Sequence, residues 1–292
     1  MNVKDFYIKH YLKLFAIPML LLLAGAFVVY NTYKETGDIF HKDVSLQGGV
    51  SATLYTEQQF DDLEGSLDRK LSTSDVTVRE LSEFGTDKQV GILIEATNVN
   101  DDELMKAIAE VTGLELNEQN YSSEQTGAAL GQAFYKQMIV AMLLAFLFMA
   151  LVVFVTFRSL VPSLAVIFSA FTDIFMTIAV MDLVGLKLST AGIAALLMLI
   201  GYSVDTDILL TTKALKRKEE GGLFERMFAG MKTGLTMTFT TIAAVTVGYF
   251  VSNSAVIKEM FLIIIIGLVF DIIATYFNNA GLLMLYMRNK HE

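Results

Sequence analysis

The chain has 292 residues, of which 54% are hydrophobic and 18% are charged, and its net charge is −9. Because soluble domains carry roughly 25% charged residues, this composition excludes an ordinary soluble protein. There is no cysteine, and the three histidines are scattered, so we expect no disulfide, no thiolate catalysis and no metal site. No cofactor is expected, and the chain is not expected to be an enzyme.

The first apolar run covers residues 14–30 and follows a short segment that contains three lysines. Residues Ala24-Gly25-Ala26 faintly resemble a signal-peptidase site, which leaves a cleaved signal peptide as an alternative. The apolar run continues through Tyr30, however, and about 20 apolar residues are enough for a helix to cross a bilayer. We therefore predict that segment 1–33 carries an uncleaved transmembrane helix.

The next segment, 34–136, is polar and has the size of a folded domain. It contains 8 basic and 20 acidic residues, which makes nucleic acid a poor partner. Alternating and helical patterns predict the order β-α-β-β-α-β, which is typical of a ferredoxin-like α+β domain. The predicted strands cover 48–56, 75–81, 89–97 and 116–122, and the predicted helices cover 57–71 and 100–113. Thr56 and Gln59 predict a capping box for the first helix, whose apolar face carries Phe60, Leu63, Leu67 and Leu71. Asn100 with Glu103 is predicted to begin the second helix, and Gly113 to end it.

The remaining segment, 137–292, contains five more apolar runs, near 137–157, 161–181, 188–212, 233–251 and 256–287. Each is long enough to span a membrane. The predicted fold is therefore a membrane α-helical bundle of six transmembrane helices with one α+β domain inserted after the first. A basic, amphipathic linker, 214–231, joins the fourth and fifth spans.

Lysine and arginine are distributed unequally between the two sides of the predicted bundle. The short loops on one side carry only Lys187 and Lys258. The positive-inside rule places the basic side in the cytoplasm, so we expect cytoplasmic termini, an extracytoplasmic domain 34–136 and a location in the plasma membrane. The basic side carries Lys4, Lys9, Lys13, Arg158, Lys213, Lys216, Arg217, Lys218, Arg226, Lys232, Arg288 and Lys290.

The fourth span contains two carboxylates in the stretch GYSVDTDILL, Asp205 and Asp207. If the span ends near Lys213, they lie about 12 Å and about 9 Å inside the membrane, where an aspartate is costly to insert. Residues two apart differ by about 200° around a helix, so the two carboxylates cannot share one pocket. Asp207 lies on the same face as Ser203 and Thr211.

Three more ionisable residues fall at membrane depth: Asp173 in the third span, Asp271 in the sixth, and Lys232 at the start of the fifth. A carboxylate in a low dielectric near a lysine has two accessible protonation states, which is the physical basis of proton coupling. We therefore predict that Asp205, Asp207, Asp173, Asp271 and Lys232 form a proton relay. The alternatives are that these residues only pair to hold helices together, or that Lys232 extends to the membrane surface.

Three motifs resemble those of the SecD/SecF family of the RND superfamily, most closely the archaeal SecF-type members. DVSLQGG, with Asp43, Gly48 and Gly49, resembles the family pattern Asp-x-x-x-Gly-Gly after the first span. GYSVDTD resembles the fourth-span motif, and FTDIFMT (171–177) resembles the third-span motif. The resemblance covers nearly the whole chain.

The resemblance implies an RND-type half bundle that acts with a SecD partner beside the Sec translocation channel. Such a complex promotes export of unfolded secreted polypeptides, and proton movement drives it in bacteria. Asp205 matches the SecD-type aspartate, Thr206 stands where bacterial SecF has its aspartate, and Lys232 stands where the family has arginine. Thr172 replaces the usual third-span histidine.

Three other functions are weighed against this one. A non-energised scaffold that binds exported chains would not need the carboxylates. An RND-type small-molecule transporter would need a second half and larger external domains. An intramembrane aspartyl protease would pair Asp173 with Asp205, but the Gly-x-Gly-Asp sequence is absent because Gly201 stands four residues before Asp205.

Overall fold

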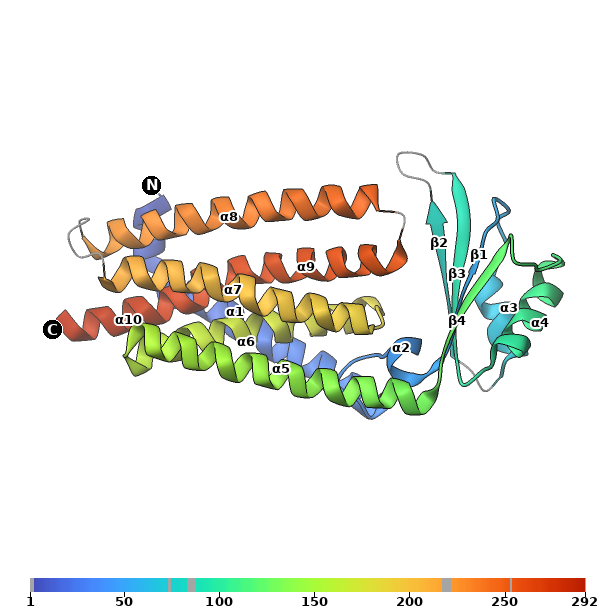
Figure 1. Cartoon of the computed structure of the whole chain (residues 1–292). Helices are drawn as coiled ribbons and strands as arrows, with labels where there is room; N and C mark the ends of the chain where they lie inside the picture. Colours follow the sequence, from blue (N-terminus) through green and yellow to red (C-terminus); the bar gives the residue numbers. More distant parts are fainter. Residues whose placement is uncertain (1–2, 73–74, 83–87, 217–221, 253, 292) are drawn as a thin grey trace.

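The computed structural model describes residues 3–72, 75–82, 88–216, 222–252 and 254–291. It consists of a bundle of long helices and a small sheet domain at one end of that bundle (Figure 1). Both chain termini lie at the opposite end, which we call the terminus end. Part of the predicted linker 214–231, residues 217–221, lies outside the described residues.

Six helical stretches in the described chain are long and apolar enough to span a membrane, as predicted. They are α1 (Val3–Thr36), α5 (Ala128–Phe157), α6 (Leu160–Val184), α7 (Thr190–Lys216), α8 (Leu223–Val251), and a last span formed by α9 (Ala255–Ile273), the π-helix η2 (Ala274–Asn279) and α10 (Ala280–His291). The chain is thus a multi-pass membrane protein.

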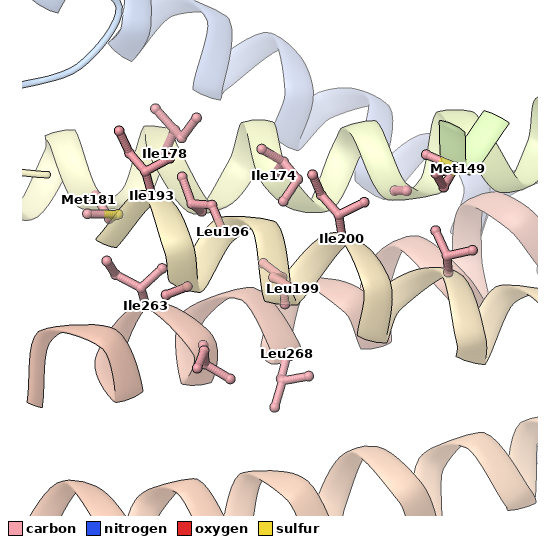
Figure 2. Close-up of a cluster of buried hydrophobic side chains, with 14 of the residues drawn as sticks. Met149, Ile174, Ile178, Met181, Ile193, Leu196, Leu199, Ile200, Ile263 and Leu268 are labelled. Carbon is pink, nitrogen blue, oxygen red and sulfur yellow. The ribbon is translucent and has the colours of Figure 1, made fainter. Parts of the chain in front are cut away.

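Helices α6 and α7 lie at the centre of the bundle. In their most apolar windows 67% and 56% of residues are buried, against 11% in α1, α5 and α8, so most of the surface of those three helices is left for lipid or for a partner. Isoleucine and leucine side chains from α6, α7 and α9 fill the space between these helices (Figure 2). Leu199 of α7 packs directly on Gly267 of α9, where the small residue lets the two helices approach closely.

The sheet domain contains four strands and two helices in the order predicted. The strand order is β2-β3-β1-β4 and every neighbouring pair is antiparallel. Helices α3 and α4 cover the face turned away from the bundle (Figure 1), which confirms the ferredoxin-like arrangement. The elements are β1 (Gly49–Leu54), α3 (Leu63–Lys70), β2 (Val76–Ser82), β3 (Gln89–Thr97), α4 (Asp101–Thr112) and β4 (Tyr121–Thr126).

Two element boundaries in this domain differ from the sequence prediction. The helix predicted from residue 57 begins only at Leu63, because Asp62 adopts a left-handed conformation (φ 51°). The hydroxyl of Thr56 accepts from the backbone of Gln58, 3.1 Å away, so it closes a turn and forms no capping box. The last strand begins at Tyr121, five residues later than predicted.

The second helix of the domain confirms its predicted caps. The side chain of Asn100 accepts from the backbone N–H of Glu103 at 2.9 Å, which satisfies one free donor at the start of α4. At the other end, Gly113 adopts φ 71° and ends the helix.

Candidate functional site: a buried carboxylate cluster

Three aspartates from three different helices are completely buried inside the bundle. They are Asp173 of α6, Asp207 of α7 and Asp271 of α9, each with 0% exposure. We call these three residues the carboxylate cluster. All three were predicted from the sequence as proton-relay residues, although the sequence could not place α9 beside α6 and α7.

Hydroxyl groups hold two of the three carboxylates. The Ser203 hydroxyl of α7 donates to Oδ2 of Asp173. The Thr206 hydroxyl donates to Asp271 Oδ1 at 3.1 Å, and that of Thr275 donates to the same oxygen at 3.1 Å. The Asp173 and Asp271 carboxyl groups lie close enough to interact directly. This network joins α6, α7 and the last span through their polar side chains.

The third carboxylate, Asp207, binds an amide. The Nδ2 group of Asn279, in η2, donates to Asp207 Oδ1 at 2.8 Å and to the Thr211 hydroxyl at 3.3 Å. Ser203 and Thr211 are fully buried with Asp207, so the face of α7 proposed from helical spacing points inward. Asp173 Oδ1 and Asp207 Oδ2 are buried without a hydrogen-bond partner.

The charge of the cluster is not balanced by a nearby cation. In the described part of the chain, no lysine or arginine forms an ion pair with any of the three aspartates. Three neighbouring ionised carboxylates shielded from water would repel one another strongly. Burial of all three is therefore less costly when one or more of the carboxyl groups carries a proton, and the number of bound protons sets the charge of the cluster. Within the described residues, no group of three or more histidine, aspartate and glutamate side chains is placed to hold a metal ion.

The two remaining predicted relay residues lie outside the cluster. Asp205 is exposed on α7, while Asp207 two residues later is buried, as the 200° separation requires. Lys232 is exposed on α8 and lines an apolar groove of about 730 Å³ together with Tyr7, Phe239 and Tyr276. The structure therefore does not bring Asp205 and Lys232 together with Asp173, Asp207 and Asp271, and the exposed position of Asp205 gives no protease-like pair with Asp173.

Sequence reasoning missed the polar side chains of the last span. Thr275, Asn278 and Asn279 are fully buried, and Asn278 Nδ2 donates to the Thr172 hydroxyl at 3.4 Å. Thr275 and Asn278 follow Asp271 by four and seven positions, so helical spacing places them on the face of Asp271. Asn279 follows by eight positions and reaches that face only because residues 274–279 form a π-helix. Two adjacent asparagines in an apolar span were the signal that could have identified them.

The motif after α1 lies where the sheet domain meets the bundle. Asp43 Oδ1 accepts from the backbone and hydroxyl of Ser45 at 2.9 and 2.6 Å, and caps the short helix α2 (Val44–Gln47). The Ser45 hydroxyl in turn accepts from the backbone of Thr190 at the start of α7, at 3.0 Å. Gly48 and Gly49 follow with φ of 91° and 149°. The motif thus connects α7 to the sheet domain.

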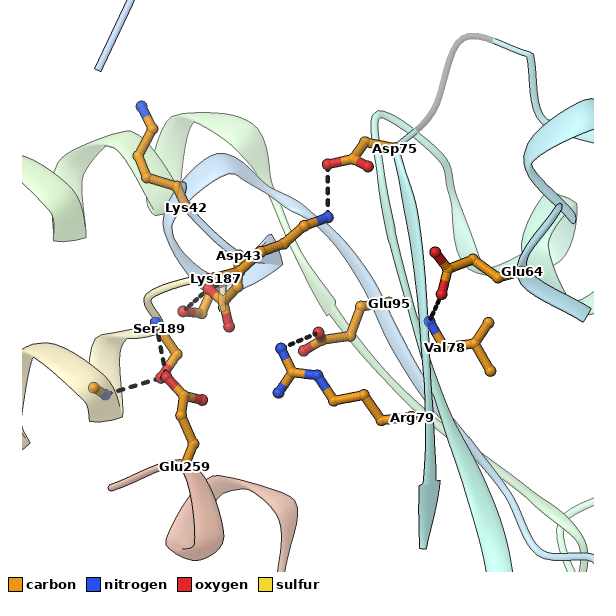
Figure 3. A network of polar contacts seen from close by, with 12 residues as sticks. Lys42, Asp43, Glu64, Asp75, Val78, Arg79, Glu95, Lys187, Ser189 and Glu259 are labelled. Atoms are coloured by element: carbon orange, nitrogen blue, oxygen red, sulfur yellow. Dashed lines mark hydrogen bonds and ion pairs between the residues drawn. The ribbon is translucent and has the colours of Figure 1, made fainter. Parts of the chain in front are cut away.

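Charged side chains surround this junction (Figure 3). Lys187, in the α6–α7 loop, binds Asp75, which directly precedes β2, at 2.6 Å, and Arg79 of β2 lies 3.7 Å from Glu95 of β3. Glu259 of α9 accepts from the Ser189 hydroxyl at 2.7 Å. We call Asp43, Asp75, Arg79, Glu95, Lys187 and Glu259 the domain junction.

Burial changes the acid–base behaviour of two junction residues outside the membrane-spanning helices. Burial raises the pKa of Asp43, and the Ser45 hydrogen bonds partly oppose this change. Burial likewise raises the pKa of Glu95, and the nearby Arg79 partly opposes it. Both carboxyl groups therefore take up protons at higher pH than exposed ones do.

The sequence profile described as "Protein export membrane protein SecD/SecF, C-terminal" matches residues 106–289. The chain is 39% identical to "Protein-export membrane protein SecF" of Methanolacinia petrolearia, over 94% of each chain. It is 37% identical to the protein of the same name from Methanothermobacter thermautotrophicus, over 97% of this chain and 95% of that one.

A solved structure shares the fold. The crystal structure of SecDF, a translocon-associated membrane protein from Thermus thermophilus, superposes with a TM-score of 0.75 at 20% identity. The match covers 99% of this chain and 40% of that chain, so the present chain spans about two fifths of SecDF. On the profile match and the two relatives, the chain belongs to the SecD/SecF family of protein-export membrane proteins.

Proposed function

We propose that this chain is an auxiliary subunit of the Sec machinery that acts with a SecD-type partner and uses proton movement through the carboxylate cluster to promote polypeptide export. The family supports the export role, since the relatives are named as protein-export membrane proteins. The observation that carries the proton coupling is the burial of Asp173, Asp207 and Asp271 together, with no cation paired to them in the described chain.

The cluster has the chemistry that a proton carrier needs. Each aspartate comes from a different helix, so a change in the number of bound protons changes the forces between α6, α7 and α9. Hydroxyl groups such as those of Ser203 and Thr206 both donate and accept, so they suit either protonation state of a carboxyl group. Protonation can thereby be converted into helix movement.

The two exposed relay residues, Asp205 and Lys232, are proposed to face the SecD-type partner. The chain spans 40% of SecDF, and a SecD-type partner would supply the rest. Asp205 of α7 and Lys232 of α8 are exposed polar groups at membrane depth, and such groups are costly against lipid. We propose that the partner covers them and that they extend the proton path to the boundary between the two proteins.

The proposed orientation follows the basic residues. Helix α7 ends at the terminus end with Lys213 and Lys216 in its last turn. The α6–α7 loop, which carries Lys187, and the start of α9, which carries Lys258, lie at the sheet end. The terminus end is then cytoplasmic and the sheet domain is outside the plasma membrane. Strands β2 and β4 are the edges of the described sheet, and an unfolded exported chain can bind such an edge by strand addition. Crosslinking from β4 that captures no exported chain during translocation would count against this contact.

The function is tested by export in cells that depend on this chain. Asp207→Asn keeps the size of the side chain but cannot exchange a proton. A proton-coupled subunit should lose at least about tenfold in export rate while still co-purifying with its SecD-type partner. A non-energised scaffold would keep both properties, so wild-type export by Asp207→Asn would reject the coupling and favour the scaffold.

A further inference from the structure

Asn279 stands apart from the other polar groups of the carboxylate cluster in its chemistry. Hydroxyl groups donate to Asp173 and Asp271, and a hydroxyl can reverse its role. Asp207 instead receives the Nδ2 group of Asn279 at 2.8 Å, and the same group donates to the Thr211 hydroxyl at 3.3 Å. In this orientation the amide presents N–H donors, and not its oxygen, to Asp207. Oδ1 of Asp207 is therefore held as an acceptor.

The other oxygen of Asp207 is left free. Oδ2 is buried and no group lies in hydrogen-bonding geometry to it. The hydroxyl groups of Ser169 in α6 and Thr275 in η2 lie near the Asp207 carboxyl group. When Asp207 takes up a proton, the amide donor on Oδ1 leaves Oδ2 as the oxygen that can carry it. The hydrogen bond from Asn279 thus distinguishes the two oxygens of one carboxyl group.

The backbone of the last span places Asn279 for this contact. In a regular α-helix, eight residues turn by about 800°, which leaves Asn279 about 80° from Asp271. Residues 274–279 form a π-helix, in which Ala280 N–H bonds to Thr275 O five residues back. Each π-helical residue turns by less than an α-helical one, so this wider turn rotates Asn279 towards the face of Asp271.

A contact from the first helix supports this turn. The hydroxyl of Tyr7 in α1 donates to the backbone carbonyl of Tyr276, in the middle of η2. Both side chains are buried, with 8% and 6% exposure. The π-helix, which is often found at functional sites, is therefore tied to α1.

We propose that Asn279 is a positioning residue for Asp207: its amide fixes Oδ1 as the acceptor and leaves Oδ2 to take and release the proton. This inference rests on the proposed function and names the oxygen at which the exchange occurs. Asn278 offers a matched control, because it is an adjacent asparagine, is equally buried, and donates to the hydroxyl of Thr172.

The test follows the reaction of Asp207 with a hydrophobic carbodiimide, which modifies protonated carboxyl groups, as a function of pH. The complete chain with its partner is used in vesicles, and modified Asp207 is measured by mass spectrometry. Asn279→Leu removes the donor at constant size, so the pH midpoint of modification should rise by about one unit, a tenfold change in proton retention. Asn278→Leu should give the wild-type curve.

Two results would overturn the assignment: a wild-type curve for Asn279→Leu, or an equal shift for Asn278→Leu. If Asn279→Leu does not fold, Asn279→Ala removes the same donor with less bulk and should shift the midpoint in the same direction. Failure of the proposed function is a separate result. If the Asp207→Asn chain still exports, the proposed function fails, but the carbodiimide curves of the Asn279 variants still show whether Asn279 positions Asp207.

Discussion

The two glycines of the DVSLQGG motif show how single residues join the sheet domain to the bundle. Gly48 has φ 91°, and a Cβ on it would collide with the backbone of Ala128 at the start of α5. Gly49 has φ 149°, and a Cβ on it would collide with the carbonyl of Ala96 in β3. Both positions therefore require glycine for backbone conformation and for close approach.

Gly48→Ala should destabilise the protein by about 3 kcal/mol, because it adds the strain of a positive φ to a backbone collision. Gly37→Ala is the matched control, since Gly37 has φ 77° but open space around it, and it should cost about 1 kcal/mol. Thermal unfolding of the two variants in detergent measures the difference. Equal losses would show that the contact with Ala128 is unimportant.

At this scale, part of the candidate site was predictable from the sequence. The inward face of Asp207 followed from its spacing to Ser203 and Thr211, and all three are buried. The contact with Asn279 was not predictable, because it depends on a π-helix and on the packing of α7 against the last span. Neither leaves a periodic pattern in the sequence.

Helices α7 and α9 are held together by a small residue facing a large one. A Cβ on Gly267 would collide with the side chain of Leu199, which is 1% exposed and cannot easily move. Helix α7 itself carries Gly201, which is exposed and would have nothing within 4 Å of an added Cβ. The two glycines therefore differ in surroundings and offer a test of this packing.

Gly267→Ala should destabilise the bundle by about 1–3 kcal/mol, because it overpacks the contact with Leu199. Gly201→Ala should be neutral or stabilise by up to about 1 kcal/mol, because alanine favours the helix more than glycine does. Unfolding of both variants in detergent compares them. The same sign of change for both would contradict close packing of α7 on α9.

At the scale of elements, apolar length identified all six spans, because membrane insertion requires about 20 apolar residues whatever the tertiary contacts. The sheet domain was less certain at its element ends. Of the predicted apolar face, Leu63, Leu67 and Leu71 are buried, whereas Phe60 lies before the helix begins and is half-buried. The late start of that helix depends on the left-handed conformation of Asp62, which helical periodicity does not reveal.

The whole molecule consists of two parts that meet at a junction containing more acids than bases. Asp43, Glu95 and Glu259 face Arg79, while Lys187 is paired with Asp75. Burial raises the pKa of Asp43 and Glu95. The two carboxyl groups therefore bind protons more tightly when the sheet domain is docked on the helix bundle than when the two parts are separated. Protonation therefore stabilises docking.

The sign of the pH dependence follows from these raised values. Docking is stabilised fully below the ordinary pKa of Glu95, 4.5, and this contribution is lost as the pH rises through the raised pKa. Spin labels on cysteines introduced at Glu118 and Val256, both exposed, are convenient because the chain has no native cysteine. Their distance distribution should broaden when the pH is changed from an acidic value below the ordinary pKa of Glu95 to an alkaline value.

Glu95→Gln, which resembles the protonated side chain, should reduce the pH response to the part that Asp43 contributes. Glu124→Gln is the control, because Ser51 pairs with both Glu95 and Glu124 across the sheet, yet Glu124 is exposed. It should respond to pH as the wild type does. A pH response in Glu95→Gln as large as that of the wild type would exclude a contribution from Glu95.

The arrangement of the two parts could be predicted only in outline. The position of the polar segment after the first span required one domain at one end of the bundle, and the structure has it there. The junction contacts could not be predicted, because Asp75, Glu95, Lys187 and Glu259 come from four separate parts of the chain. For the same reason, the sequence could not predict that Asp173, Asp207 and Asp271 lie together, because only the packing of α6, α7 and α9 brings them side by side.

Proton flux into vesicles that contain the chain and its SecD-type partner tests the central claim most directly. Wild-type vesicles under an imposed pH gradient should acidify during export, and Asp207→Asn should reduce the flux at least about tenfold because the buried site then cannot exchange a proton. Asp68→Asn, which alters an exposed aspartate of α3, should have no effect. Flux in Asp207→Asn equal to that of the wild type would contradict the account.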